Sequence, residues 1–187
     1  TMLLIMEALD DGRIHLDDQV TASETAAAKG GSQIYLKAGE TMPVSDMLKS
    51  IAVSSANDCA CAMAELIAGS ESAFVEQMNQ RAQELGMSGT HFVNPHGLHS
   101  DDHYTTARDI FKMAKQAMTH ATFREIVSTG TYTVPATNLS GERTLYNTNA
   151  LLTSALHPGY TYSGTIGIKT GSTGQAGYCL TAAVEMK

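Results

Sequence analysis

Three polar residues stand where their side chains could take part in proton transfer or bind an anion. Lys169 interrupts an apolar run with strand character, which is costly on a buried strand unless the ammonium faces a cleft or a partner. Ser55 and Asn57 form a Ser-x-Asn triplet just before a strongly helical stretch. A serine hydroxyl both donates and accepts hydrogen bonds, and an asparagine amide can donate to a carbonyl. The alternatives are a surface lysine that extends to water and two helix-capping residues.

The residues around Lys169 and Ser55 resemble two of the three sequence elements of penicillin-binding proteins and serine β-lactamases. One element is Lys-Thr-Gly, here Lys169 to Gly171, and the other is the Ser-x-Asn triplet that begins at Ser55. The third element, Ser-x-x-Lys, supplies the attacking serine in those enzymes and occurs nowhere in the 187 residues. The chain therefore matches this group of enzymes in two elements and lacks the one that carries the nucleophile.

Longer stretches narrow the resemblance to one family. Residues 84–98, which end in Asn-Pro-His-Gly-Leu, and residues 103–109 are similar to serine-type D-alanyl-D-alanine carboxypeptidases, the low-molecular-mass penicillin-binding proteins. Residues 31–40, 55–68 and 148–179 extend the similarity in the family's order. The resemblance covers essentially the whole chain, and it implies an α+β fold in which a helical lobe packs on an antiparallel sheet.

The resemblance implies catalytic roles for Ser55, Asn57 and Lys169. The Ser55 hydroxyl would carry a proton between the lysines of the site and the departing D-alanine nitrogen. The Asn57 amide would donate to the peptide carbonyl of the substrate and hold the lysine of the Ser-x-x-Lys element. The Lys169 ammonium would favour the terminal carboxylate of the substrate and disfavour protonation of that catalytic lysine.

The resemblance also implies a substrate-binding strand formed by the four residues after Lys169. Thr170 would hydrogen-bond the terminal carboxylate, and Thr173 would be a further contact for the same group. Gly171 has no Cβ atom, so a substrate could lie against it as an added β-strand. The backbone N–H of Ser172 would be one donor to the oxyanion, and the N–H of the nucleophile would be the other. No metal and no cofactor is implied.

The two ends of the chain give a further expectation. In the family, Ser-x-x-Lys is followed by a Thr-Met-rich apolar stretch that residues 1–9 resemble, and more strands and a final helix follow the Lys-Thr-Gly strand. We therefore expect residues 1–187 to be a partial transpeptidase-like catalytic domain, incomplete at both ends. Such a piece would leave strand edges unpaired, so we expect it to need a missing chain segment as a partner and not to be a stable monomer alone.

Composition and charge limit the other classes of function. With 187 residues, 43% of them apolar, the chain suits one sizeable hydrophobic core. Its formal charge of −7, without a basic run, argues against a nucleic-acid surface. No stretch approaches the roughly 20 apolar residues that span a bilayer, so membrane anchoring would depend on segments outside these residues.

Cysteines and histidines form no recognisable metal-binding pattern. Cys59 and Cys61 stand two apart in an expected helix and are interpreted as small buried apolar residues, and Cys179 as a strand residue. Four histidines lie in a Gly/Pro/Asp-rich loop without the spacing that places two imidazoles on one helix face: His91, His96, His99 and His103. We interpret them as polar loop residues.

Helix patterns dominate the first two thirds of the chain, and strand patterns follow. Apolar spacing and stop signals predict helices over residues 2–9, 45–53, 57–68, 70–86, 106–118 and 122–127. Ser45 or Asp46, Ser70 and Thr106 are expected as N-caps, Thr106 in a capping box with Asp109. Strands are expected over residues 131–134, 164–170 and 178–184.

The function implied is removal of the terminal D-alanine from peptidoglycan stem peptides through a serine acyl-enzyme. The protein would be a β-lactam target outside the cytoplasm, in the cell envelope. Two alternatives remain. The chain as given, without the nucleophile, could bind peptidoglycan or a partner chain without turnover. A serine β-lactamase would need a deacylating carboxylate, and neither Glu142 nor Asp101 lies in a motif that supports one.

Overall fold

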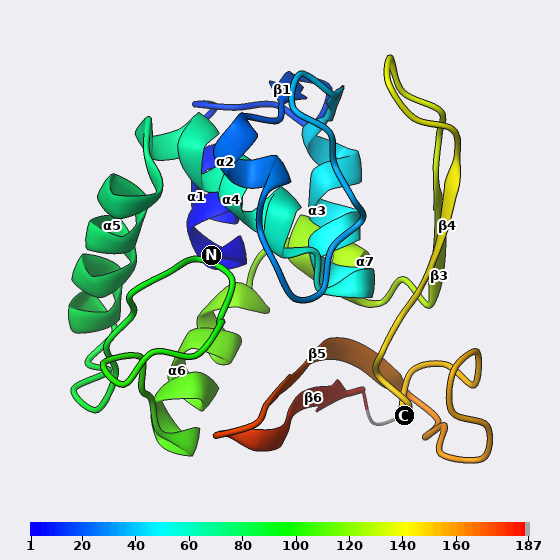
Figure 1. Cartoon of the computed structure of the whole chain (residues 1–187). Helices are drawn as coiled ribbons and strands as arrows, with labels where there is room; N and C mark the ends of the chain where they lie inside the picture. The colour runs from blue at the N-terminus through cyan, green and yellow to red at the C-terminus, as the bar shows by residue number, and fades with distance from the viewer. Residues whose placement is uncertain (186–187) are drawn as a thin grey trace.

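The computed structural model describes residues 1–185 and has a mixed α+β fold (Figure 1). The helices gather on one side, β5 and β6 form a ribbon next to them, and β3 and β4 form a projecting hairpin (Figure 1). The bounds are α1 Met2–Asp10, β1 Gln19–Thr21, α2 Glu24–Ala27, β2 Thr41–Pro43, α3 Val44–Ser54, α4 Asn57–Ala68, α5 Glu71–Glu84, α6 Ala107–Ala117, α7 Ala121–Val127, β3 Thr131–Val134, β4 Arg143–Tyr146, β5 Thr165–Thr173 and β6 Gly177–Val184. The helices and late strands predicted from the sequence are therefore present.

Helix α4 is the centre of the helical part. Every residue from Asn57 to Ala64 is buried, so the first two turns of the helix are enclosed on all sides, and only its last turn reaches the surface. Small side chains along it let α2, α3 and α5 pack against it. Cys59 and Cys61 are free and buried, which confirms their interpretation as small core residues. Among residues 1–185, no helix has the length and apolar character needed to cross a membrane.

Two of the predicted helix caps are confirmed. The Ser70 hydroxyl accepts a hydrogen bond from the N–H of Ala73 at 3.1 Å, and the Thr106 hydroxyl accepts one from the N–H of Asp109 at 3.2 Å. The capping box, however, is only half formed. The Asp109 carboxylate accepts from the N–H of Gly89 at 2.9 Å, so it fixes the preceding loop and does not return to Thr106.

Two other predicted helix starts are wrong. Helix α3 begins at Val44, directly where β2 ends, so Ser45 and Asp46 lie inside its first turn and do not cap it. The Asp46 carboxylate instead accepts a hydrogen bond from the hydroxyl of Tyr132 on β3 at 2.5 Å. Helix α7 begins one residue before Thr122. For α3, the end of β2 sets the start of the helix.

The strands form three separate two-stranded antiparallel sheets in the described residues, β1–β2, β3–β4 and β5–β6. The prediction missed β1, β2, β4 and the four-residue helix α2. These elements are three or four residues long, which is too short for a periodic pattern. Strand β5 also runs three residues past the predicted end, to Thr173, so all of the predicted substrate-binding residues lie on it.

A buried carboxylate joins the β3–β4 hairpin to the segment before β2. Glu40 is fully buried and accepts hydrogen bonds from the Thr137 hydroxyl at 2.7 Å, the Ser140 hydroxyl at 3.1 Å and the Arg143 guanidinium. The N–H of Lys37 also donates to it, at 3.0 Å. A buried carboxylate is stable only when it is paired and hydrogen-bonded. This network therefore fixes the hairpin, and with it the end of β4 that leads towards β5.

Close packing against α7 holds β5 in place. Gly167 has a φ of 137°, and a Cβ atom on it would lie 2.8 Å from Cγ2 of Val127, the last residue of α7. Only glycine allows this backbone to come so near. The next residue, Ile168, is buried in the main core. Together these contacts set the position of Lys169, which follows directly.

Candidate active site

Ser55 lies at the junction of α3 and α4, in a conformation that is unusual for a serine. Its φ of 61° and ψ of 37° fall in the left-handed region, which residues other than glycine rarely adopt. Ser55 is the C-cap of α3, where its backbone N–H donates to the carbonyl oxygen of Ser50. The N-cap of α4 is Ala56, so the Ser55 side chain does not cap the helix that follows it. The Ser55 Oγ instead accepts a hydrogen bond from Lys169. Backbone strain of this kind clusters at functional sites.

Lys169 reaches Ser55 from β5, across 114 positions of sequence. Its Nζ donates to the Ser55 Oγ at 3.0 Å and to the carbonyl oxygen of Thr170 at 2.9 Å. Both acceptors are neutral. Burial of the ammonium lowers the pKa of Lys169 to about 8. A largely desolvated positive charge beside neutral acceptors favours an anionic ligand, and this inward position does not support the surface-lysine alternative.

The burial of Lys169 predicts that the stability of the protein depends on pH. The pKa of an unperturbed lysine is 10.5 and that of Lys169 in the fold is about 8, so folding releases a proton between these values. Because the unfolded state binds more protons there, the free energy of unfolding should rise from about pH 8 to about pH 10.5. Below pH 8 both states are protonated, and the full cost of burying the ammonium is present.

Urea unfolding of the complete protein, at several pH values in that window, checks this expectation. The wild type should gain stability with increasing pH relative to a Lys169→Met variant, which has no charge to lose at this position. The same pH dependence in both proteins would show that Lys169 is not desolvated as described.

Asn57 is buried at the start of α4 and binds the loop before it. Its Nδ2 donates to the carbonyl oxygen of Gly30 at 2.8 Å, and its backbone N–H donates to the carbonyl oxygen of Ser32 at 2.8 Å. A Cβ atom on Gly31 would lie 2.7 Å from the Asn57 Nδ2, so this loop is in tight contact with the amide. The Asn57 side chain does not cap α4. An asparagine amide carries two hydrogens, and the bond to Gly30 uses one of them.

The predicted substrate-binding residues continue along β5. The Thr170 Oγ1 lies 2.5 Å from the Oγ1 of Thr148. Gly171 is exposed, and a Cβ atom on it would touch only the Cβ of Cys179, at 4.0 Å. The surface beside Gly171 is therefore open. Within residues 1–185, β5 pairs with β6 alone, so its other edge carries backbone groups that could pair with an extended peptide.

The last two predicted residues lie further from Ser55. Ser172 is exposed and pairs across the ribbon with Tyr178. The Thr173 Oγ1 accepts a hydrogen bond from the N–H of Ala176 at 2.9 Å, so it stabilises the turn between β5 and β6. At the rise of an ordinary strand, Thr173 is about 13 Å from Lys169. The structure thus brings Ser55, Lys169 and Thr170 together and gives Thr173 a different local role.

The sequence prediction missed Thr148 as a site residue. Thr148 lies in a stretch that resembles the family, but no motif singles it out, and yet its hydroxyl contacts that of Thr170 directly. The available signal was its position between two asparagines, Asn147 and Asn149, which are both buried. Buried asparagines outside regular elements usually fix a turn. Only the tertiary structure shows that this turn faces β5.

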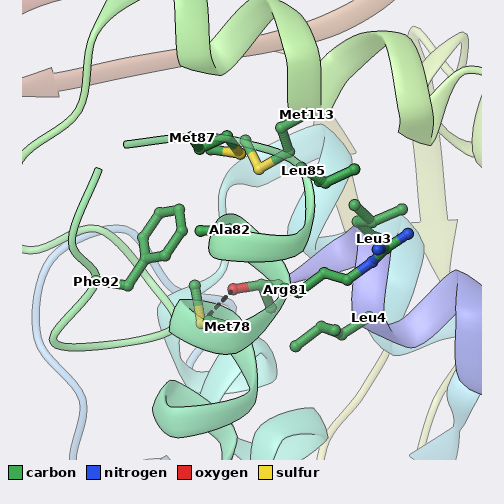
Figure 2. Close-up of a pocket in the computed structure, with 10 residues that line it drawn as sticks. Leu3, Leu4, Met78, Arg81, Ala82, Leu85, Met87, Phe92 and Met113 are labelled. Carbon is green, nitrogen blue, oxygen red and sulfur yellow. Dashed lines mark hydrogen bonds between the residues drawn. The ribbon is translucent and has the colours of Figure 1, made fainter. Parts of the chain in front are cut away.

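Figure 2 shows a small pocket between α1 and α5, and neither Ser55 nor Lys169 is among the residues that line it. Its lining is mostly apolar and includes Met78, Met87, Phe92 and Met113. The free volume is about 20 Å³, which is room for a single water molecule. This pocket is too small to hold a peptide.

The four loop histidines contact other residues of the loop or, in the case of His96, a carboxylate on α5. His91 Nδ1 lies 2.7 Å from the carbonyl oxygen of Asp102, and the N–H of Val93 donates to His103 Nδ1 at 3.4 Å. His96 and His99 lie 3.3 Å from the carboxylates of Glu71 and Asp101 respectively. Nowhere in residues 1–185 do three His, Cys, Asp or Glu side chains form a group suited to a metal ion.

The chain is similar to curated proteins of one kind. It is 48% identical over 186 residues to the D-alanyl-D-alanine carboxypeptidase DacF of Bacillus subtilis, covering 99% of this chain and 46% of that protein. It is 34% identical over 189 residues to the D-alanyl-D-alanine carboxypeptidase DacA of Escherichia coli, covering 97% of this chain and 44% of that protein. The chain therefore spans about half the length of these relatives.

Solved structures agree with this similarity. The DD-transpeptidase of a Streptomyces strain superimposes with a TM-score of 0.85 at 32% identity, covering 99% of this chain and 73% of that one. Penicillin-binding protein 5 of Haemophilus influenzae has a TM-score of 0.85 at 32% identity, covering 98% of this chain and 51% of that one.

The family model for peptidase family S11, described as D-alanyl-D-alanine carboxypeptidase, matches residues 1–187. The match therefore includes both Ser55 and Lys169, the two residues that form the hydrogen bond of the candidate site. With the fold, the curated relatives and the family model in agreement, the chain belongs to the D-alanyl-D-alanine carboxypeptidase family of serine peptidases.

Proposed function

We propose that the complete protein is a serine D-alanyl-D-alanine carboxypeptidase that removes the terminal D-alanine from peptidoglycan stem peptides and is acylated by β-lactams. Residues 1–187 would form part of one transpeptidase-like catalytic domain. The observation that carries the proposal is the 3.0 Å hydrogen bond from Lys169 to Ser55, beside the open strand surface at Gly171. It brings a hydroxyl and a positive charge together beside a strand that has a free edge within residues 1–185, which supports the proposal.

The substrate would bind along the free edge of β5. An extended peptide can pair with the backbone of this strand, and the open surface at Gly171 leaves room for its main chain. The terminal carboxylate would then lie near the Lys169 ammonium and the Thr170 hydroxyl. A charge-assisted hydrogen bond from a hydroxyl to a carboxylate is about twice as strong as a neutral one. These groups favour a substrate, or a β-lactam, that carries a carboxylate at this position.

The reaction needs a serine nucleophile and a base, which we propose are supplied by a Ser-x-x-Lys segment of the complete protein outside these 187 residues. The nucleophilic oxygen would attack the carbonyl carbon of the D-alanyl-D-alanine bond while its proton passes to the lysine of that segment. The C–N bond would then break, and the departing nitrogen would take a proton. Water would later hydrolyse the acyl-enzyme and release the shortened peptide.

Ser55 would donate that second proton. Lys169 donates to the Ser55 Oγ, so the hydrogen of the Ser55 hydroxyl is left for another acceptor. The departing nitrogen of D-alanine is such an acceptor, and the base lysine could return a proton to Ser55. In this scheme Lys169 fixes the orientation of the Ser55 hydroxyl and stabilises negative charge at the site. Asn57 would donate its second amide hydrogen to the peptide carbonyl of the substrate.

The substrate class implies a place of action. Peptidoglycan stem peptides lie outside the cytoplasm, so we propose that the complete protein works in the cell envelope as a secreted or anchored enzyme. Any membrane anchor would be provided by segments outside these residues.

Release of D-alanine tests the proposed function. The complete protein, incubated with a pentapeptide that ends in D-Ala-D-Ala, should release one D-alanine per peptide and should turn over benzylpenicillin only slowly. Rapid hydrolysis of benzylpenicillin without D-alanine release would identify a β-lactamase instead. Peptide binding without any release would favour a non-catalytic binding protein.

A further inference from the structure

Two threonines from different parts of the chain meet beside the Ser55–Lys169 contact. The Oγ1 atoms of Thr148 and Thr170 are 2.5 Å apart, although 22 positions separate them. Thr170 follows Lys169 on β5, and Thr148 follows the end of β4. Both side chains are partly buried, so the contact is protected from competition by bulk water. The two hydroxyls are therefore hydrogen-bonded to each other, and either could be the donor.

Hydrogen bonds of the two neighbouring asparagines position Thr148. The preceding residue, Asn147, is 2% exposed, and its Nδ2 donates to the carbonyl oxygen of Thr129 at 2.9 Å. The following residue, Asn149, is 1% exposed, and its N–H donates to the Oδ1 of Asn147 at 2.9 Å. The Asn149 Oδ1 in turn accepts from the N–H of Leu151 at 3.1 Å. Two buried amides therefore fix the backbone on both sides of Thr148.

Hydrogen-bond counting gives the direction of the Thr148–Thr170 bond once a substrate is bound. A threonine hydroxyl has one hydrogen to donate and two lone pairs to accept with. If Thr170 donates its hydrogen to a carboxylate, it cannot also donate to Thr148, so Thr148 must be the donor. A hydroxyl that accepts one hydrogen bond donates a stronger one, because the two bonds polarise each other.

We propose that Thr148 is a positioning residue for carboxylate recognition: its hydroxyl donates to Thr170 and thereby aims the Thr170 hydroxyl at the terminal carboxylate of the substrate. The inference deepens the proposed function and rests on it. The carboxylate end of the substrate is recognised by a relay of two hydroxyls, the outer one touching the ligand and the inner one fixed by the buried turn after β4. Specificity for a free carboxylate then depends on a residue outside the family's short motifs.

Two matched substrates test this inference in the complete protein. Both are thioesters of an acylated D-alanine, one with a leaving group that ends in a carboxylate and the other with a leaving group that ends in a carboxamide. Thr148→Val keeps the shape of the side chain and removes the hydroxyl. It should lower kcat/KM for the carboxylate substrate about tenfold, mainly through KM, and leave the carboxamide substrate within about twofold. Thr148→Ser should restore the carboxylate preference.

Thr144→Val is the matched control. Thr144 forms the same kind of hydroxyl contact with Thr133, at 3.2 Å across the β3–β4 hairpin, and it is exposed. Its replacement should leave both substrates unchanged. Equal losses on both substrates in Thr148→Val, or no loss on either, would overturn the role of Thr148. Absence of reaction in the wild type with either thioester would instead contradict the proposed function itself.

Discussion

Replacing Lys169 by methionine in the complete protein is expected to lower the rate of acylation by benzylpenicillin by about 100- to 1,000-fold. Methionine has nearly the length of lysine and no charge, so it removes the hydrogen bond to Ser55 and the positive potential while it keeps the volume. Groups that stabilise charge in a desolvated site have effects of this size, because water cannot replace them. Stopped-flow mixing with the β-lactam gives the rate directly.

The same variant should be no less stable than the wild type near neutral pH. Burial lowers the pKa of Lys169, which means that the folded chain tolerates the ammonium at a cost. A Lys115→Met variant is the control, because Lys115 is an exposed lysine on α6 and its loss should change neither acylation nor stability. A Lys169→Met protein that is acylated at the wild-type rate would remove Lys169 from the mechanism.

Replacing Ser55 by alanine is expected to reduce kcat for release of D-alanine by about 100-fold or more. Alanine keeps the Cβ atom, so the left-handed backbone at this position is under similar strain in both proteins. The substitution removes the hydroxyl that accepts the hydrogen bond from Lys169. In our proposal this hydroxyl donates a proton to the leaving nitrogen. Steady-state kinetics on a D-Ala-D-Ala peptide, with KM determined separately, measure this loss.

The neighbouring serine provides the control for Ser55. The Ser54 hydroxyl donates to the carbonyl oxygen of Ser50 within α3, at 3.1 Å, whereas the Lys169 ammonium donates to Ser55 and Thr170. Ser54→Ala should therefore retain kcat within about twofold. If Ser55→Ala loses no more activity than Ser54→Ala, the proton path runs through another group.

Local patterns in the sequence predicted much of the helical part. The spacing of Phe74, Met78 and Ala82 predicts α5, and these three side chains are buried. The hydroxyls of Ser70 and Thr106 cap the helices that they precede, because a cap depends on residues three positions away and is visible locally. Ser45 gives the same signal and does not cap, because α3 begins directly where β2 ends.

Contacts between distant segments could not be predicted. Glu40 is fully buried because Arg143 and two hydroxyls from the β3–β4 hairpin surround it, and no local pattern relates residues about 100 positions apart. Strands β1 and β2 have three residues each, so neither shows a strand pattern of its own, and they form because they pair with each other. For the same reason Thr148 was not recognised as a neighbour of Thr170.

The candidate site was located by motif resemblance, and its geometry came from the structure. The sequence indicated Ser55, Asn57 and Lys169 but left capping and surface roles open. The bond from Lys169 to Ser55 argues against a surface role for the lysine, and the N-cap of α4 is Ala56 and not Ser55. The bond joins residues 114 positions apart, so no local pattern could show it. For Thr173 the resemblance implied a contact with the substrate carboxylate, whereas in the structure its hydroxyl stabilises the turn after β5.

The most direct test of the central claim is the intact mass of the complete protein before and after incubation with benzylpenicillin. We predict a gain of one penicilloyl group per molecule, with the modified serine followed three residues later by lysine, and a much slower gain in Lys169→Met. A protein whose mass does not change, although it is folded and binds the peptide, would contradict the assignment as an acyl-enzyme carboxypeptidase.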